Sequence, residues 1–153
     1  MENIFQKALN FVLAQEGGFS NDPDDNGGAT NLGITQRVFN GYLAHKGLKP
    51  LSVKNINRLQ AEEIYRVNYW LKTGCHKMSP IFAILCFDTA VNMGVSRALE
   101  FLSAAKWSSV EVFLLARIEK YVSLAKTPSQ RKFLLGWLNR VFRLYSYLKK
   151  IEV

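Results

Sequence analysis

Residues 16–35 read EGGFSNDPDDNGGATNLGIT, and they separate an N-terminal helical pattern from the rest of the chain. Before them, apolar residues recur at steps of three and four between Ile4 and Leu13, which predicts an amphipathic helix over about residues 3–16. The Gly17-Gly18 pair ends this helix. Residues 18–33 then hold four glycines, one proline, three Asp and three Asn, too many breakers for a helix. A loop of this length is usually functional.

Helical signals dominate the remainder of the chain. We expect helices from Thr35 to about Ala44, from Ser52 or Asn57 to Thr73-Gly74, from Ser79-Pro80 to Met93, from Ser96 to about Ala105, from Ser108 or Ser109 to about Ala125, and from Thr127-Pro128 to about Lys149. The predicted apolar stripe of the second of these is Leu59, Ile64, Val67 and Leu71. Strand-like alternation is almost absent, so the predicted fold class is all-α, with six or seven helices and at most a small hairpin within residues 18–34.

Length and composition predict one globular unit, residues 1–153. The 153 residues suit a single core, and 48% hydrophobic with 21% charged residues exclude a disordered or low-complexity chain. The net charge of +8 points to a polyanionic partner: nucleic acid, anionic lipid or cell-wall polymer. Residues 1–34 carry −4 and the other residues +12, while residues 126–150 hold seven bases and no acid. The acidic start and the basic end suggest two separate roles.

The termini and the cysteines exclude several classes. The first residues lack a basic segment followed by an apolar stretch, so we expect synthesis in the cytoplasm without a signal peptide. The most apolar run, Ile81–Val91, is too short to span a bilayer, and no stable membrane insertion is expected. Cys75 and Cys86 lack metal-ligand spacing; we expect buried thiols, with His45 and His76 on the surface, no metal and no cofactor.

The acidic loop offers two carboxyl groups with different surroundings. Glu16 continues the apolar face of the first helix near its C-terminal end, where burial and the helix dipole disfavour the ionised form, as a general acid requires. Asp22, Asp24 and Asp25 lie in a polar, solvated segment. Such a pair suits cleavage of a glycosidic bond. On residue types alone, an exposed helix end with a solvated turn or a weak calcium loop remains an alternative, although the closing Glu of a calcium loop is missing.

Residues 16–35 closely resemble the signature of glycoside hydrolase family 108, muramidases that include phage endolysins. The resemblance continues in residues 61–65 with Tyr69-Trp70, in residues 88–94 and in residues 136–141. It implies a helical, lysozyme-like fold and hydrolysis of the β-1,4 bond between N-acetylmuramic acid and N-acetylglucosamine. Residues 1–94 would form the catalytic part, and residues 95–153 a divergent peptidoglycan-binding region that lacks the Asp-Gly and Ile-Gly elements of the family.

The same resemblance assigns roles to individual residues. Glu16 matches the catalytic glutamate. Asp25, nine positions later as in related phage lysozymes, would be the second carboxylate that places or activates water, and Thr30 would help to hold this water. Asp22 also matches a family position, as a substrate-binding residue and as the rival for the second carboxylate.

Other polar and aromatic residues have both a functional and a structural interpretation. Asn92 is a candidate sugar contact, and Tyr69 and Trp70 are candidates for a stacking wall, although helical aromatics belong more often to a core. Asp88, one turn before Asn92, is expected to hydrogen bond to the acidic loop or to a helix end. Trp137 is expected to anchor the last helix.

The basic residues near Trp137 have a simple interpretation as a solvated face. They are Arg140, Arg143, Lys149 and Lys150. Attraction of anionic wall polymer or lipid is the functional alternative.

We therefore predict a monomeric peptidoglycan hydrolase, a lysozyme-type endolysin that acts on the cell wall in the periplasm after release. A catalytically inactive wall-binding or scaffold module is the alternative, which Glu16, Asp25 and Thr30 argue against. Binding to nucleic acid is not expected, because charge alone supports it and no recognition helix stands out.

Overall fold

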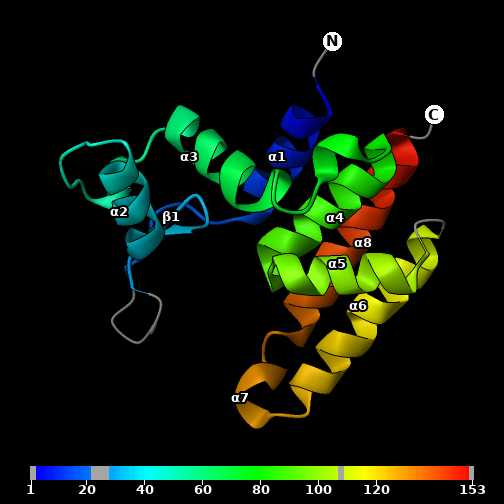
Figure 1. Ribbon diagram of the computed structural model, residues 1–153. Coiled ribbons are helices and arrows are strands. Elements are labelled where there is room, and N and C mark those ends of the chain that lie inside the picture. Colours follow the sequence, from blue (N-terminus) through cyan, green and yellow to red (C-terminus); the bar gives the residue numbers. More distant parts are fainter. Residues whose placement is uncertain (1–2, 22–27, 107–108, 152–153) are drawn as a thin grey trace. The chain divides into compact units, whose positions relative to one another are not determined.

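The computed structural model describes residues 3–21, 28–106 and 109–151, and it is almost entirely helical (Figure 1). The helices are α1 (Ile4–Gln15), α2 (Gln36–His45), α3 (Arg58–Tyr65), α4 (Pro80–Met93), α5 (Val95–Ala104), α6 (Val110–Ala125), α7 (Pro128–Arg131) and α8 (Leu134–Ile151). Short 3₁₀ turns, η1 (Val53–Asn55) and η3 (Cys75–Lys77), and a π-helical turn, η2 (Arg66–Trp70), lie between them. Strands β1 (Thr30–Asn31) and β2 (Ile34–Thr35) form a hairpin. The all-α class with a small hairpin is confirmed.

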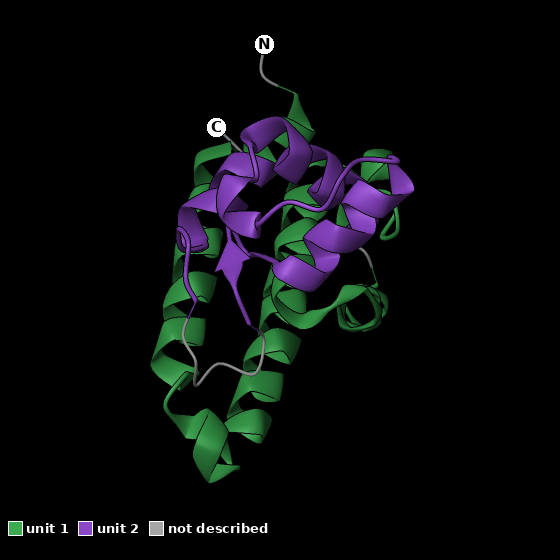
Figure 2. Cartoon of the chain, turned by 90° about the vertical axis from the view of Figure 1, so that its left-hand side faces the viewer, with its two compact units in different colours: residues 1–8, 69–153 green, residues 9–68 purple. Residues whose placement is uncertain are grey.

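The chain forms two compact units, shown in different colours in Figure 2. Unit 1 comprises residues 1–8 and 69–153, and unit 2 comprises residues 9–68. In unit 1, α4 packs against α5 and α8, and α6 packs against α5, α7 and α8. In unit 2, the hairpin packs against η1 and α2. The sequence predicts a catalytic part up to residue 94 and a wall-binding part after it. This division is one of function, which the two compact units do not test, so it stays a prediction.

Capping residues explain where several helices begin. The Thr35 side chain accepts a hydrogen bond from the amide of Val38, as predicted for the N-cap of α2. Ser52 and Asn57 were alternative starts for one predicted helix, and each caps an element of its own. Ser52 caps η1, and Asn57 caps α3 in a reciprocal capping box with Gln60. Ser109 caps α6.

Three details of the predicted helices were wrong. The predicted apolar stripe is wrong at three positions, which are exposed: Leu59, Val67 and Leu71. The buried residues of α3 are instead Ala61, Ile64 and Tyr65, and the π turn η2 then breaks the 3.6-residue period. Ser96 lies inside α5, which starts directly after Gly94. The last predicted helix is in fact two helices, α7 and α8. A 3₁₀-type turn, in which the Phe133 amide donates to the Gln130 carbonyl, follows α7 and separates the two.

A buried charge cluster joins three helices of unit 1. The Asp88 carboxylate on α4 accepts hydrogen bonds from Arg117 Nη1 on α6 at 2.7 Å and from Arg140 Nε on α8 at 3.0 Å. Arg117 also donates to Thr89 at 2.9 Å and to Tyr121 at 3.0 Å. Arginines bind Asp88, and the expected bond to the acidic loop stays a prediction, since residues 22–27 lie outside the described residues. The cluster corrects one expectation: Arg140 is buried rather than part of a solvated face.

Smaller predictions about side chains in unit 1 were confirmed. Cys75 and Cys86 are buried, free thiols, and His76 is exposed. Trp137 stacks on Tyr121, with ring centroids 5.0 Å apart, and so joins α8 to α6. In unit 2, His45 is exposed, as expected. Across the described residues, no helix is both long and apolar enough to cross a bilayer.

Candidate active site

The hairpin that follows the acidic loop has a tight two-residue turn. Thr30 pairs with Thr35 and Asn31 with Ile34, which leaves Leu32 and Gly33 in the turn with φ values of 51° and 73°. Two successive positive φ values match the twist of antiparallel strands, and glycine adopts them without strain. Two hydrogen bonds from the Asn31 side chain, to the carbonyls of residues 53 and 54, tie the hairpin to η1. The turn therefore has a fixed position within unit 2.

Glu16 lies directly against this turn. Its amide donates to the carbonyl of Val12 at 3.1 Å, which places it just beyond the C-terminal end of α1, and its side chain is half-buried. A Cβ atom at Gly33 would lie 2.8 Å from Cγ and 3.0 Å from Oε2 of Glu16. Only glycine fits there, and the glycine backbone forms one wall around the carboxyl group. This half-burial fits both the predicted general acid and its alternative, a partly exposed helix end.

Tyr65 of α3 flanks the same point. Its hydroxyl donates to the carbonyl of Leu32 at 2.8 Å, and its ring is buried. The hydroxyl oxygen would lie 2.5 Å from a Cβ at Gly33, so Glu16 and Tyr65 both approach this glycine closely. The hydrogen bond fixes the turn carbonyl and thereby holds Gly33 against Glu16. Tyr65 is thus a positioning residue for the carboxyl group.

Thr30 lies at the beginning of the hairpin and is half-buried. Its backbone exchanges two hydrogen bonds with Ser20, at 2.8 and 2.9 Å, so the two ends of the acidic loop lie next to each other. The predicted role of Thr30 in holding water stays a prediction.

The remaining predicted site residues lie either outside the described residues or in unit 1. Asp22 and Asp25, with Asp24, lie outside the described residues. Tyr69, Trp70 and Asn92 belong to unit 1. Trp70 is only 4% exposed and packs edge-on against Phe5 and Phe87 in the core, which corrects its assignment to an exposed stacking wall.

Tyr69 and Asn92 of unit 1 are half-buried. Asn92 accepts a hydrogen bond from the hydroxyl of Tyr121 and lines a cavity of about 330 Å³. Burial is the main cause that raises the pKa of Tyr121, so this hydroxyl remains a donor. Sugar contacts of Tyr69 and Asn92 stay predictions.

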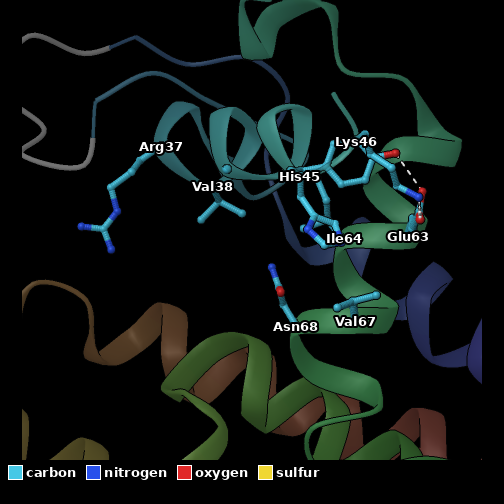
Figure 3. Close-up of a pocket in the computed structure, with 10 residues that line it drawn as sticks. Arg37, Val38, His45, Lys46, Glu63, Ile64, Val67 and Asn68 are labelled. Atoms are coloured by element: carbon cyan, nitrogen blue, oxygen red, sulfur yellow. Dashed lines mark hydrogen bonds and ion pairs between the residues drawn. The ribbon is translucent and has the colours of Figure 1, made fainter. Parts of the chain in front are cut away.

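Unit 2 also contains a larger cavity, of about 510 Å³, between α2 and the segment from α3 to η2 (Figure 3). Tyr42 donates to Glu63 Oε2 at 2.8 Å, and Lys46 forms an ion pair with the same carboxylate. Hydrogen bonds from Lys46 and Tyr42 lower the pKa of Glu63. Neither Glu16 nor Thr30 lines this cavity, so its size does not mark the predicted catalytic position.

Sequence reasoning did not assign a role to Gly33 or Tyr65. Both lie within stretches that had been singled out, residues 16–35 and 61–65, so a signal existed. The sequence does not show that the two residues are in contact. They are 32 positions apart, and local patterns relate only residues that are close in the sequence.

Comparison with known proteins places the chain in a family. The family model described as Glycosyl hydrolase 108 matches residues 9–94, which include all of α1 beyond residue 8, the acidic loop, the hairpin and α4. No curated protein matches the chain. Among solved structures, that of Brucella abortus SagA is similar with a TM-score of 0.74 and 27% identity, over 95% of this chain and 94% of the other. Since the matched model spans more than half of the sequence and contains Glu16 with its surrounding hairpin, the chain belongs to the glycosyl hydrolase 108 family and is a glycoside hydrolase.

Proposed function

We propose that this glycoside hydrolase is an N-acetylmuramidase that cleaves peptidoglycan at the β-1,4 bond between N-acetylmuramic acid and N-acetylglucosamine. The observation that supports this most is the half-buried carboxyl of Glu16, held against the backbone of Gly33 beside Tyr65. A carboxyl group in such a position can protonate a leaving oxygen.

In the proposed reaction, Glu16 donates its proton to the glycosidic oxygen as the bond to the anomeric carbon breaks. Asp25 orients or activates the water that attacks the anomeric carbon, and Thr30 helps to hold this water. Asp22 binds substrate, or takes the place of Asp25. Comparing Asp25→Asn with Asp22→Asn separates these two assignments, since only loss of the second carboxylate stops the reaction.

The basic remainder of the chain suits an anionic cell wall as substrate. The residues beyond 34 carry +12, which attracts the carboxylates of peptidoglycan and raises the rate of encounter. We further propose that the protein acts as a phage-type endolysin, as a monomer that reaches the periplasm after its release from the cytoplasm. Lysis of cells that express it only when the inner membrane is permeabilised would support this, and lysis without permeabilisation would contradict it.

The deciding experiment is digestion of purified peptidoglycan followed by mass analysis of the products. A muramidase leaves N-acetylmuramic acid at the reducing end, whereas a glucosaminidase leaves N-acetylglucosamine there. Glu16→Gln should abolish product formation with an unchanged circular dichroism spectrum, and Glu119→Gln, at an exposed position of α6, should retain it. Binding without any products by the wild-type protein would instead favour the inactive wall-binding module.

A further inference from the structure

The outward side of α8, which runs from orange to red in Figure 1, carries apolar and basic side chains together. Leu135 is 71% exposed and Phe142 is 62% exposed. Leu135, Phe142 and Lys149 follow one another at seven-residue steps, so they lie along one stripe of the helix. These two large apolar side chains therefore form an exposed apolar line along α8.

Basic residues border this stripe. Arg143 and Lys150 are exposed and lie on its flank, and Lys149 continues it toward the C-terminal end of α8. Between residues 126 and 150 the sequence contains no acid, and the next one is Glu152. From the neighbouring helix, Glu111 approaches this region, with its carboxylate 3.5 Å from the Tyr145 hydroxyl. A backbone hydrogen bond is the main cause that lowers the pKa of Glu111, and the nearby positive charge of Lys149 contributes. Because Lys149 lies near this carboxylate, Arg143 and Lys150 are the more useful probes.

Helix α6 provides an internal comparison. It also has exposed apolar side chains, Leu115 at 59% and Val122 at 48%. Its exposed side includes Glu111 and Glu119, so acids accompany its apolar residues. Of the two helices, only α8 combines an apolar stripe with flanking bases.

We propose that this face of α8 (Leu135, Phe142, Arg143, Lys149 and Lys150) docks onto the surface of an anionic lipid bilayer. A helix of this kind lies in the interface plane, with its apolar residues at the boundary of headgroups and acyl chains and its bases against the lipid phosphates. A soluble polyanion would bind the bases but leave Leu135 and Phe142 in water. A bilayer surface satisfies both kinds of side chain, and long basic side chains reach the headgroups.

The test is co-sedimentation with vesicles that contain phosphatidylglycerol, with phosphatidylcholine vesicles for comparison. The protein should bind the first and not the second, and added salt should weaken binding. Each base near an anionic surface strengthens binding by roughly fivefold, so Arg143→Gln/Lys150→Gln should weaken it by roughly 30-fold. Phe142→Ser should weaken it by about tenfold or more. The matched control, Leu115→Ser, removes a similarly exposed side chain from α6 and should bind like the wild type.

Three results would overturn the proposal. One is equal binding to the two kinds of vesicle, and another is an equal loss in Leu115→Ser and Phe142→Ser. The third is concentration-dependent dimerisation in sedimentation velocity that Phe142→Ser abolishes, without vesicle binding, because the stripe would then contact a second copy of this chain. The vesicles contain no glycan, so the outcome is independent of the proposed role of Glu16.

Discussion

Replacing Gly33 by alanine tests whether the hairpin turn positions the carboxyl group of Glu16. The new Cβ would lie 2.8 Å from Glu16 Cγ, whereas carbon atoms in contact are separated by about 3.5–4.0 Å. Relief of this overlap requires a shift of about 0.7–1.2 Å between the turn and the Glu16 side chain. The new Cβ would also lie 2.5 Å from the Tyr65 hydroxyl, which bonds to the preceding carbonyl, so the Tyr65 contact is strained as well. Both side chains that flank Gly33 must therefore shift, and Glu16 is one of them.

The expected loss of activity is large compared with the loss of stability. A displacement of about 1 Å at a catalytic group can lower the rate by roughly 100-fold. Alanine at φ 73° costs about 1–2 kcal/mol of folding free energy, which lowers the midpoint of thermal unfolding by roughly 2–8 °C for a chain of this size. At 25 °C the variant should thus be folded and nearly inactive.

The assay measures kcat/KM for solubilisation of dyed peptidoglycan, with thermal unfolding measured on the same samples. Gly47→Ala is the matched control, since Gly47 also lies in unit 2 and has a φ of 67°, but a Cβ there meets nothing within 4 Å. It should lose no more stability than Gly33→Ala and should keep its activity. Wild-type kcat/KM in Gly33→Ala, or an equal loss in Gly47→Ala, would refute the positioning argument.

Three other substitutions or measurements follow from the buried contacts. Asp88→Asn should lower the free energy of unfolding, measured by urea titration, by about 3–5 kcal/mol, because Arg117 would keep its buried charge without a countercharge. A loss below about 1 kcal/mol would contradict this. Tyr65→Phe should lower it by only about 1 kcal/mol, while kcat falls more than KM changes, and an unchanged kcat would speak against its role. The hydrogen bond to Cys75, together with burial, raises the pKa of Cys86, so this thiol stays protonated. It should therefore react with Ellman's reagent at pH 8 only after the protein unfolds. Fast reaction of the native protein would contradict its burial.

Local patterns predicted most of the helices but not how the chain turns between them. The caps at Thr35, Asn57 and Ser109 were visible because a cap is a relation between residues two or three positions apart. The π turn η2 and the interruption before α8 have no such signal. They depend on how whole helices pack, so the stripe predicted through Val67 failed there.

Charged residues show the same limit. Nothing next to Asp88 in the sequence indicates its partners, because Arg117 and Arg140 follow at separations of 29 and 52 positions. A basic residue in a basic segment is expected to face water, and only the packing of α8 against α4 and α6 shows that Arg140 is buried.

By itself, the sequence determined the helical class and predicted Glu16 as the general acid, because helix periodicity, breaker residues and a family signature are all local along the chain. Only the tertiary structure decided that Gly33 and Tyr65 surround Glu16 and that Trp70 belongs to the core. It also decided that Leu135 and Phe142 point into solvent. The physical reason is that burial and close contact depend on which distant segments pack together, and a pattern of neighbouring residues does not contain that information.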